Sequence, residues 1–255
     1  MLQDIDDKAL ERGLKTVSGS LDRLVKKGSI DEARKADVLS HIRTATKVGG
    51  LADADLIIEA ATENEGLKVR VLKDVDAIAR ADAVIATNTS SISITRLAAA
   101  LKSPERFVGM HFFNPVPVMA LVEIIRGLRT SEETVSAVTE LAEKLGKTPI
   151  GVKNSAGFVV NRILCPMINE AIFVLQEDLA SAEEIDAGMK LGCNHPIGPL
   201  ALCDLIGLDV ELAVMEVLYG NFNDPKYRPA PLLREMVDAG MLGRKSGRGF
   251  YRYDK

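Results

Sequence analysis

The chain has 255 residues, of which 47% are hydrophobic and 27% are charged, and its formal net charge is −4 at pH 7. These proportions are typical of soluble globular proteins and argue against disordered, collagen-like and membrane proteins. No apolar run reaches the roughly 18 residues that a membrane-spanning helix needs. The small acidic excess disfavours a basic nucleic-acid-binding protein. Three cysteines without a C-x-x-C pair, together with an acidic N-terminus, predict a cytoplasmic protein without a metal site.

The first half of the chain alternates helical and strand-like segments. Leucine and valine recur at helical spacing over residues 10–24, and Gly28 ends this predicted helix. Ser29 and Glu32 form a capping-box pattern that predicts the start of a second helix. The elements predicted next are a strand at 55–61, a helix at 67–78, a strand at 83–87 and a helix at 94–101. Strands separated by such helices predict βαβ crossovers, and hence an α/β fold with a doubly wound, mostly parallel sheet.

The pattern then changes. Residues 107–113 and 121–125 are both strand-like, and only seven residues connect them. This connection is too short for a parallel crossover, so the two strands are expected to pair antiparallel. The remaining predicted elements of this part are a helix opened by a capping box of Thr130 and Glu133, and a strand at 149–152.

Strand signals are nearly absent from residue 156 onward. The predicted helices there cover residues 157–176, 181–191, 199–218 and 231–239, and a glycine-rich basic segment follows at 243–251. A capping box of Ser181 and Glu184 opens the second of these helices. We therefore expect two domains, an α/β domain at 1–154 and an all-helical domain at 155–255.

Polar segments follow two of the predicted strands. In an open α/β sheet, ligands bind beyond the carboxyl ends of the parallel strands. Residues 61–64, with the sequence A-T-E-N, and residues 87–91, with the sequence T-N-T-S-S, stand at such positions. A helix cap with a turn would also explain the second segment, so the structural and the ligand-binding interpretations both stay open.

His111 and Glu123 lie in the two strands that are predicted to pair antiparallel. A carboxylate in an apolar strand is costly to bury and is seldom left unpaired. The hairpin brings Glu123 within reach of His111, and a carboxylate that orients an imidazole is a common way to build a general base at neutral pH. On these residues alone, a buried salt bridge without a catalytic role is the alternative.

Four further polar residues are candidates for a functional role, and for the first three of them a structural interpretation stays open beside the functional one. Asn161, in an apolar helical stretch, either bonds nearby backbone or closes a cleft between the domains. Ser20 and Lys27 are seven residues apart on one helix face, which is either solvated or contacts a phosphate-bearing ligand. Asp4 follows Leu2-Gln3 as an acid follows the second strand of a Rossmann fold, where it bonds the adenine ribose of NAD.

Eight segments of the chain resemble the L-3-hydroxyacyl-CoA dehydrogenase family, and within it the bacterial 3-hydroxybutyryl-CoA dehydrogenases. They are A-T-N-T-S-S-I-S-I-T, H-F-F-N-P-V-P-V-M, L-V-E-I-I, G-F-V-V-N-R-I, D-A-G-M-K-L-G, H-P-I-G-P-L, D-L-I-G-L-D and G-R-K-S-G-R-G-F-Y. They occur in the family's order, and their combination is far more specific than any one motif. The resemblance implies a Rossmann-like NAD-binding domain and a helical domain for substrate binding and dimerisation. It also implies reversible, NAD-dependent oxidation of (S)-3-hydroxybutyryl-CoA or another short-chain 3-hydroxyacyl-CoA, in fatty-acid or butanoate metabolism.

The resemblance further implies a role for each matched residue. His111 is implied as the catalytic base that takes the proton of the 3-hydroxyl group, with Glu123 orienting it. Ser90 and Asn161 match polar residues around the substrate and the nicotinamide. The implied cofactor contacts are Asp4, Glu63, Lys68, Ser90, Asn114 and Lys245, and the implied coenzyme A contacts are Ser20 and Lys27. A homodimer or larger assembly is also implied, because the family's helical domain carries the subunit interface.

The family pattern begins with a strand, a G-x-G-x-x-G loop and a helix, to which no part of these 255 residues corresponds. Such a segment has roughly 25–30 residues. Because the glycine-rich loop holds the pyrophosphate of the dinucleotide, we expect this chain to bind NAD weakly. Two functions follow: the dehydrogenase, and a catalytically impaired, dimerising acyl-CoA-binding remnant of that enzyme.

Overall fold

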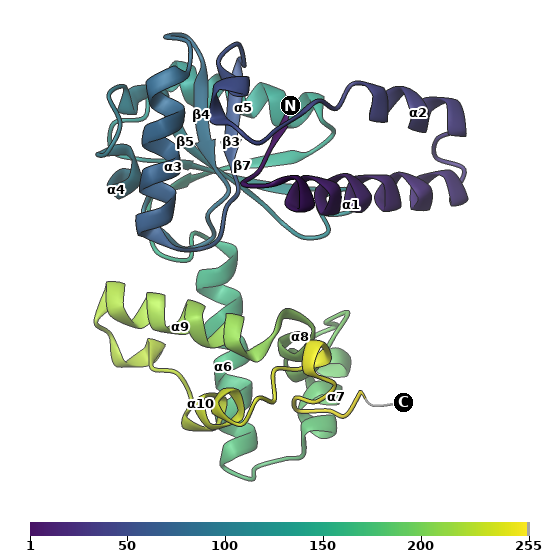
Figure 1. Ribbon diagram of the computed structural model, residues 1–255. Helices are drawn as coiled ribbons and strands as arrows, with labels where there is room; N and C mark the ends of the chain where they lie inside the picture. Colours follow the sequence, from purple (N-terminus) through teal and green to yellow (C-terminus); the bar gives the residue numbers. More distant parts are fainter. Residues whose placement is uncertain (254–255) are drawn as a thin grey trace. The chain divides into compact units, whose positions relative to one another are not determined.

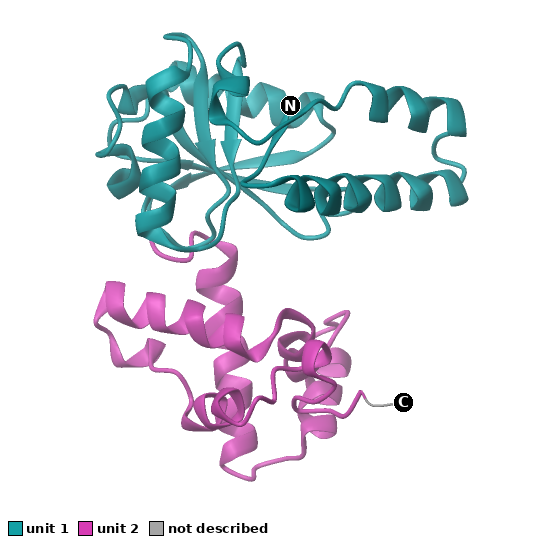
Figure 2. Ribbon diagram, viewed as in Figure 1, with its two compact units in different colours: residues 1–154 teal, residues 155–255 magenta. Residues whose placement is uncertain are grey.

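The computed structural model describes residues 1–253 of the chain (Figure 1). The chain divides into two compact units, the first from Met1 to Asn154 and the second from Ser155 onward (Figure 2). The first unit combines strands and helices, whereas the second is helical. The predicted fold class is therefore confirmed.

A five-stranded sheet of order β3-β4-β5-β6-β7 forms the centre of the first unit. Strands β3, β4 and β5 are parallel, β5 and β6 are antiparallel, and β6 and β7 are parallel. The antiparallel pair that the short connection predicted is thus confirmed. The strands are β3 (Leu56–Glu59), β4 (Val84–Thr87), β5 (Phe107–Phe112), β6 (Leu121–Arg126) and β7 (Thr148–Lys153).

Helices cover both faces of this sheet. Val108 and Met110 of β5 belong to the same buried cluster as Val138 of α5. Gly109 between them faces the other side, where an added Cβ would meet Ile94 of α4. Because side chains alternate along a strand, α4 and α5 lie on opposite faces of the sheet. The helices packed on this sheet are α3 (Glu65–Ile78), α4 (Ile94–Ala98) and α5 (Glu132–Lys144).

A separate two-stranded sheet pairs β1 with β2 in parallel. The chain between these strands forms α1 and α2, which pack against each other and extend away from the strands (Figure 1). Gly28, with a φ of +70°, follows α1 as the sequence predicts, because a glycine readily takes this conformation after a helix. The elements are β1 (Leu2–Gln3), α1 (Asp7–Lys26), α2 (Glu32–Ser40) and β2 (Thr44–Ala45).

The second unit is a group of five helices around an apolar core. The helices are α6 (Val160–Gln176), α7 (Ala182–Gly192), α8 (Pro199–Ile206), α9 (Leu208–Phe222) and α10 (Pro231–Asp238). Short 3-10 turns lie at Pro225–Tyr227 and Arg244–Ser246 of this unit, and at Val48–Leu51 and Pro104–Arg106 of the first unit. No helix within residues 1–253 is both long and apolar enough to cross a membrane.

The C-terminal segment is fixed to α8 by Asp204. Its carboxylate accepts hydrogen bonds from the backbone N–H groups of Phe250 and Tyr251, both at 3.0 Å. A Cβ at Gly249 would lie 1.9 Å from Oδ1 of Asp204, so only glycine allows this approach. The glycine-rich segment is therefore an ordered part of the helical unit.

Two predicted helix caps are wrong. Asp31 rather than Ser29 caps α2, and its side chain accepts from a backbone N–H of the first turn. Ser131 rather than Thr130 caps α5. The Thr130 hydroxyl instead donates to the carbonyl of Phe107 at 2.7 Å, so a tertiary contact competes with the capping position.

The predicted helix at 199–218 is also wrong, because Gly207 divides it into α8 and α9. Gly207 has a φ of +109°, which an ordinary residue adopts only with strain. The apolar periodicity continues across this glycine, so periodicity alone does not reveal the break. The capping box of Ser181 and Glu184 at the start of α7 is confirmed.

Candidate active site

His111 and Glu123 face each other across β5 and β6. They are direct partners in the antiparallel register, and Nδ1 of His111 lies 2.7 Å from Oε2 of Glu123. The His111 side chain is 8% exposed and the Glu123 side chain 0%. The contact predicted from the hairpin is confirmed.

This hydrogen bond assigns the two ring nitrogens of His111. A carboxylate only accepts hydrogen bonds, so Nδ1 is the donor and the basic lone pair belongs to Nε2. Glu123 also stabilises the imidazolium that forms when Nε2 takes a proton. The ring of Phe113 packs on the imidazole with 4.6 Å between the ring centroids. The arrangement suits an oriented general base.

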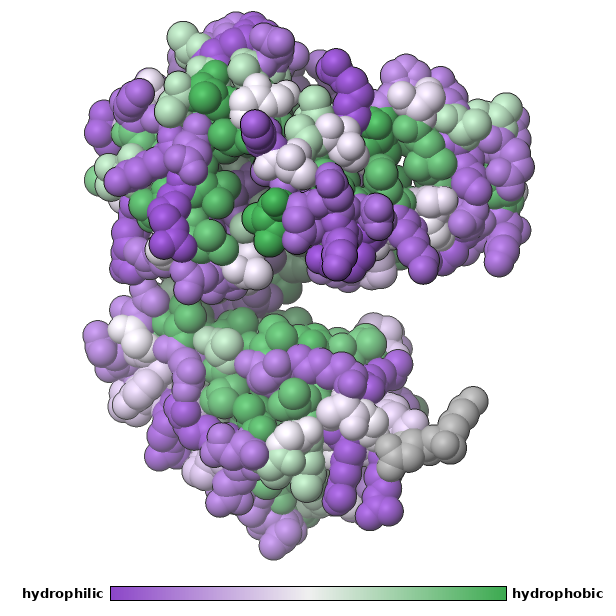
Figure 3. Space-filling view, in the orientation of Figure 1, coloured by the Kyte–Doolittle hydropathy of each residue, from purple (hydrophilic) through white to green (hydrophobic). Residues whose placement is uncertain are grey.

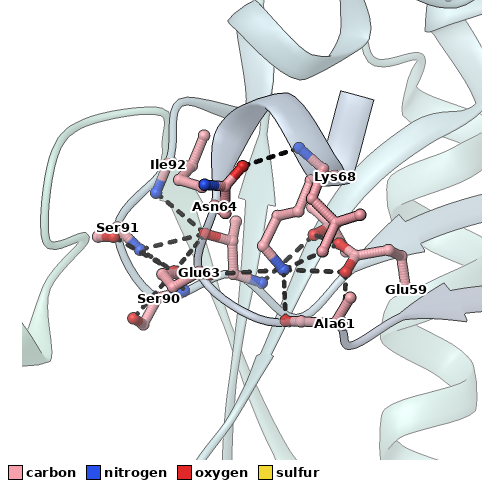
Figure 4. Close-up of polar contacts among 11 residues, drawn as sticks. Glu59, Ala61, Glu63, Asn64, Lys68, Ser90, Ser91 and Ile92 are labelled. Carbon is pink, nitrogen blue, oxygen red and sulfur yellow. Dashed lines mark hydrogen bonds and ion pairs between the residues drawn. The ribbon is translucent and has the colours of Figure 1, made fainter. Parts of the chain in front are cut away.

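Glu63, which follows β3, organises the residues that follow β4 (Figure 4). Its Oε1 accepts hydrogen bonds from the Thr89 hydroxyl at 2.6 Å, the Ser90 N–H at 2.7 Å and the Ser91 N–H at 3.1 Å. We call these three residues the Ser90 loop. Burial acts to raise the pKa of Glu63. The hydrogen bonds from the loop and the ammonium group of Lys68 outweigh burial, so the pKa of Glu63 lies below its ordinary value.

A buried ion pair lies beside Glu63. Nζ of Lys68 is 2.9 Å and 3.1 Å from the two carboxylate oxygens of Glu59, and both side chains are 1% exposed. Glu59 also accepts from the Thr87 hydroxyl at 2.6 Å. The resemblance implied a direct cofactor contact for Lys68, and this burial does not fit such a contact. The lysine instead lies beneath the residues that a ligand would meet.

Asn88 connects this network to the strand of His111. Its backbone N–H donates to the carbonyl of Glu59 at 2.7 Å, and its Oδ1 accepts from the N–H of Phe112 at 2.9 Å. The side chain thus continues the hydrogen bonding between β4 and β5 beyond the last residue of β4. Asn88 therefore fixes the network around Glu59 and the strand of His111 relative to each other, at the carboxyl ends of β4 and β5.

The other predicted residues of the first unit lie apart from this network. Asp4 directly follows β1, and its Oδ1 accepts from the N–H of Ile5 at 2.7 Å. Asn114 is exposed in the connection between β5 and β6. Ser20 lies on α1 and accepts from Arg23, while Lys27 is the exposed residue that ends this helix.

Two predicted residues belong to the second unit. Asn161 is half-buried in the first turn of α6. Lys245 forms an ion pair with Asp209, with 2.5 Å between Nζ and Oδ1. The predicted site residues therefore come from both units of the chain.

Sequence reasoning missed Glu59, Thr87 and Asn88 as members of the network. Glu59 carries the signal that singled out Glu123, since it is a carboxylate at the end of an apolar strand, L-I-I-E. Its partner Lys68 comes from a helix, so strand pairing does not reveal it. Asn88 stands in the polar segment after β4, but its contact with Phe112 depends on the strand order.

The part of the chain that the structure describes contains no group of three His, Cys, Asp or Glu side chains placed to hold a metal ion. The polar residues at the carboxyl ends of the strands are carboxylates, hydroxyls, amides and one imidazole. Such groups are suited to hydrogen bonding with an organic cofactor and substrate.

Two family models match the chain. The NAD-binding domain of 3-hydroxyacyl-CoA dehydrogenase matches residues 1–155, and the C-terminal domain of the same enzyme matches residues 157–253. A probable 3-hydroxybutyryl-CoA dehydrogenase from Deinococcus radiodurans is 52% identical over 99% of this chain and 91% of its own length. A 3-hydroxybutyryl-CoA dehydrogenase from Clostridioides difficile is 52% identical over 97% of this chain and 88% of its own length.

Solved structures agree with the sequence matches. An (S)-3-hydroxybutyryl-CoA dehydrogenase from Ralstonia eutropha has a TM-score of 0.95 and 65% identity, with 99% of this chain and 89% of that chain covered. The comparisons support the dehydrogenase interpretation rather than the acyl-CoA-binding remnant. They bear out the family resemblance and identify NAD as the family's cofactor. The chain belongs to the 3-hydroxyacyl-CoA dehydrogenase family.

Proposed function

We propose that this protein oxidises the 3-hydroxyl group of (S)-3-hydroxybutyryl-CoA to the 3-oxo group, reversibly and with NAD. The observation that carries the proposal is the 2.7 Å hydrogen bond between buried Glu123 and His111, in the unit matched by the NAD-binding family model. The preference for a four-carbon acyl group rests on the relatives, which are named 3-hydroxybutyryl-CoA dehydrogenases.

His111 performs the proton transfer in this proposal. Nε2 takes the proton of the 3-hydroxyl group as the C3 hydrogen leaves as a hydride, and the C–O bond becomes a double bond. Glu123 offsets the positive charge that the imidazole gains. Ser90 and Asn161 contribute hydrogen bonds that orient the hydroxyl group and the nicotinamide. In the reverse direction, His111 returns the proton to the 3-oxo oxygen.

The residues of the first unit fit NAD. NAD accepts the hydride when it is bound. Asp4 uses Oδ1 to accept from Ile5, so Oδ2 serves a ribose hydroxyl at the end of β1. Glu63 and Ser90 lie at the carboxyl ends of neighbouring strands, where a dinucleotide binds in an open α/β sheet. Asn114 of this unit and Lys245 of the helical unit complete the proposed cofactor contacts.

The coenzyme A part of the substrate is assigned to α1. Ser20 and Lys27 share one helix face, and Lys27 is exposed at the C-terminal end of the helix. A hydroxyl and an ammonium group at this spacing suit a phosphate-bearing nucleotide. We therefore assign the first unit to the cofactor and to the coenzyme A part of the substrate, and the helical unit to another part of substrate binding.

A homodimer formed by the helical unit is the proposed assembly. Ile163, Leu179 and Leu191 of this unit are 67%, 74% and 85% exposed. Hydrophobic residues, drawn in green, are visible at the surface of this unit in the space-filling view (Figure 3). Exposed large apolar side chains are common at the surfaces where subunits meet. Light scattering coupled to gel filtration would give the mass of a single chain if this proposal is wrong.

The substrate is tested by the reduction of 3-oxoacyl-CoA compounds with NADH, followed through NADH absorbance. We expect the highest kcat/KM with acetoacetyl-CoA and lower values with ten-carbon and longer 3-oxoacyl-CoA. Calorimetry with acetoacetyl-CoA is the control, because it measures whether this compound binds independently of turnover. Binding without NADH oxidation by any of these compounds would contradict the dehydrogenase and identify an acyl-CoA-binding protein.

A further inference from the structure

We propose that Glu59 and Lys68 are positioning residues that act through Glu63 to hold Ser90 in place for the reaction. This inference rests on the proposed function, because it gives a task within the same site to two residues below it. We call Glu59, Lys68 and Glu63 the charge triad (Figure 4).

The ammonium group of Lys68 lies among acceptors inside the protein. An ammonium group has three N–H donors and no acceptor. Nζ of Lys68 lies 2.9 Å from Oε1 of Glu59, 3.0 Å from the carbonyl of Ala61 and 3.4 Å from Oε2 of Glu63. The Lys68 side chain is 1% exposed, so these protein groups, rather than solvent, surround its ammonium group. The ammonium group of Lys68 therefore pairs with the carboxylates of Glu59 and Glu63.

Glu59 keeps the ammonium group in place. One of its oxygens accepts from the Ala61 N–H at 2.6 Å, and the other accepts from the Thr87 hydroxyl at 2.6 Å. Thr87 is the last residue of β4 and Glu59 the last residue of β3. The carboxylate is therefore fixed by two adjacent strand ends, and this fixes the cation that draws Oε2 of Glu63.

Glu63 in turn fixes the Ser90 loop. Its Oε1 receives the N–H groups of Ser90 and Ser91 together with three hydroxyl contacts, those of Thr89, Ser90 and Ser91. One oxygen cannot keep five donors at full strength. The Ser90 hydroxyl, at 3.1 Å, is longer than the Ser90 N–H contact at 2.7 Å. The backbone thus holds the loop, and the hydroxyl is the donor that can turn to a substrate.

The test removes both charges of the buried pair together. Lys68→Met alone leaves a buried carboxylate unpaired and threatens folding, whereas replacing both partners with neutral residues of similar volume is often tolerated. The Glu59→Gln/Lys68→Met variant is compared with a Glu65→Gln/Arg96→Met variant. The control removes the exposed ion pair between α3 and α4, whose side chains are 41% and 61% exposed.

Hydrogen exchange of residues 87–93 in the protein without ligands reports on the Ser90 loop. We expect the Glu59→Gln/Lys68→Met variant to keep its urea unfolding midpoint close to that of the parent chain. Its loop amides should exchange roughly 10- to 100-fold faster, because the carboxylate of Glu63 that accepts their hydrogen bonds is no longer held by the ammonium group of Lys68. The exposed-pair variant should exchange like the parent. Unchanged loop exchange in a folded double variant would overturn the proposal.

A double-mutant cycle, measured by kcat/KM, separates the positioning of Ser90 from a merely structural role of the buried pair. Ser90→Ala is introduced into the parent chain and into the Glu59→Gln/Lys68→Met variant, and kcat/KM for acetoacetyl-CoA is measured. Because Ser90 is already misplaced in the variant, we expect its removal to cost at least fivefold less there than in the parent. An equal cost in both backgrounds would overturn the proposal. A parent chain without turnover, but with the expected change in exchange, would reject the dehydrogenase and leave the loop assignment supported.

Discussion

Each unit of the protein contains a glutamate that is 0% exposed, and the two glutamates have different surroundings. Glu123 of β6 has His111 as its partner at 2.7 Å. Glu211 of α9 has no hydrogen-bond partner on either carboxyl oxygen among residues 1–253. Burial raises the pKa of Glu211 to about 8. The same residue type at the same depth thus has a hydrogen-bonded partner in one unit and lowers stability in the other, because burial of a carboxylate is costly unless a partner compensates for it.

The neighbours of Glu211 explain why it remains unpaired. Cys165 of α6 and Cys203 of α8 lie near it, and burial raises the pKa of both thiols. A thiol is either neutral or negatively charged, so neither of these neighbours offers the carboxyl group of Glu211 a positive charge. His111, in contrast, can accept a proton and meet Glu123 as a cation.

The largest expected effect comes from removing the partner of Glu123. His111→Ala should lower kcat by roughly 10²- to 10⁴-fold, since the general base is lost. NADH affinity, measured by calorimetry, should stay near the parent value. His41→Ala, at the exposed end of α2, is the matched control. Parent-like turnover of His111→Ala would remove this residue from the mechanism.

The second effect concerns the unpaired glutamate and its pH dependence. The folded-state pKa of Glu211, about 8, lies above its ordinary value of 4.5, so the folded state keeps a proton that the unfolded chain has released. Stability should therefore fall as pH rises from about 4.5 to about 8, by an amount on the order of 3 to 5 kcal/mol.

Glu211→Gln should remove this pH dependence and raise the free energy of unfolding at pH 8. Urea unfolding across this pH range measures both quantities. Glu170→Gln, at an exposed position of α6, is the control and should follow the parent chain. A Glu211→Gln variant whose pH profile matches that of the parent would show that this carboxyl group is ionised in the folded protein.

The third effect comes from the paired glutamate. Glu123→Gln keeps the side-chain shape but removes the charge opposite the imidazolium. A charge-assisted hydrogen bond is worth about 1.5–3 kcal/mol, so kcat should fall roughly 10- to 100-fold. The KM for acetoacetyl-CoA should change little, because the substrate does not depend on this charge for binding. An unchanged kcat would show that His111 and Glu123 form a buried salt bridge without a catalytic role.

The predictability of these two glutamates from sequence also differs. The partner of Glu123 was predictable because a seven-residue connection forces the two strands to pair. Glu211 lies at helical spacing with Leu208, Met215 and Leu218, all of them buried. The periodicity therefore shows that position 211 is internal. Sequence alone does not show what faces it, because the neighbours come from other helices.

The rest of the fold shows the same difference: features set by residues near in sequence were predictable, and features set by distant residues were not. Local signals predicted β1, the five strands of the large sheet, most helices and the capping box of Ser181, but they did not predict β2 (Thr44–Ala45). The network of Glu59, Lys68 and Glu63 was not predictable, because it joins a strand end, a helix and a loop. The interruption at Gly207 required a backbone angle that apolar periodicity does not report.

The smallest effect concerns an exposed charge, the opposite extreme from the buried glutamates. Lys27 ends α1 at the surface, where water and salt weaken its interactions. A surface lysine that contacts a phosphate contributes about 1 kcal/mol, so Lys27→Ala should raise the KM for acetoacetyl-CoA about fivefold at low ionic strength. The effect should fade with added salt and be absent for a substrate analogue that lacks the nucleotide.

Lys26→Ala is the matched control, because Lys26 is adjacent in sequence but points about 100° away from the face of Ser20. An equal effect of both substitutions would indicate general attraction by the basic end of the helix, and a larger effect of Lys27→Ala would indicate a phosphate seated on the face that Ser20 and Lys27 share.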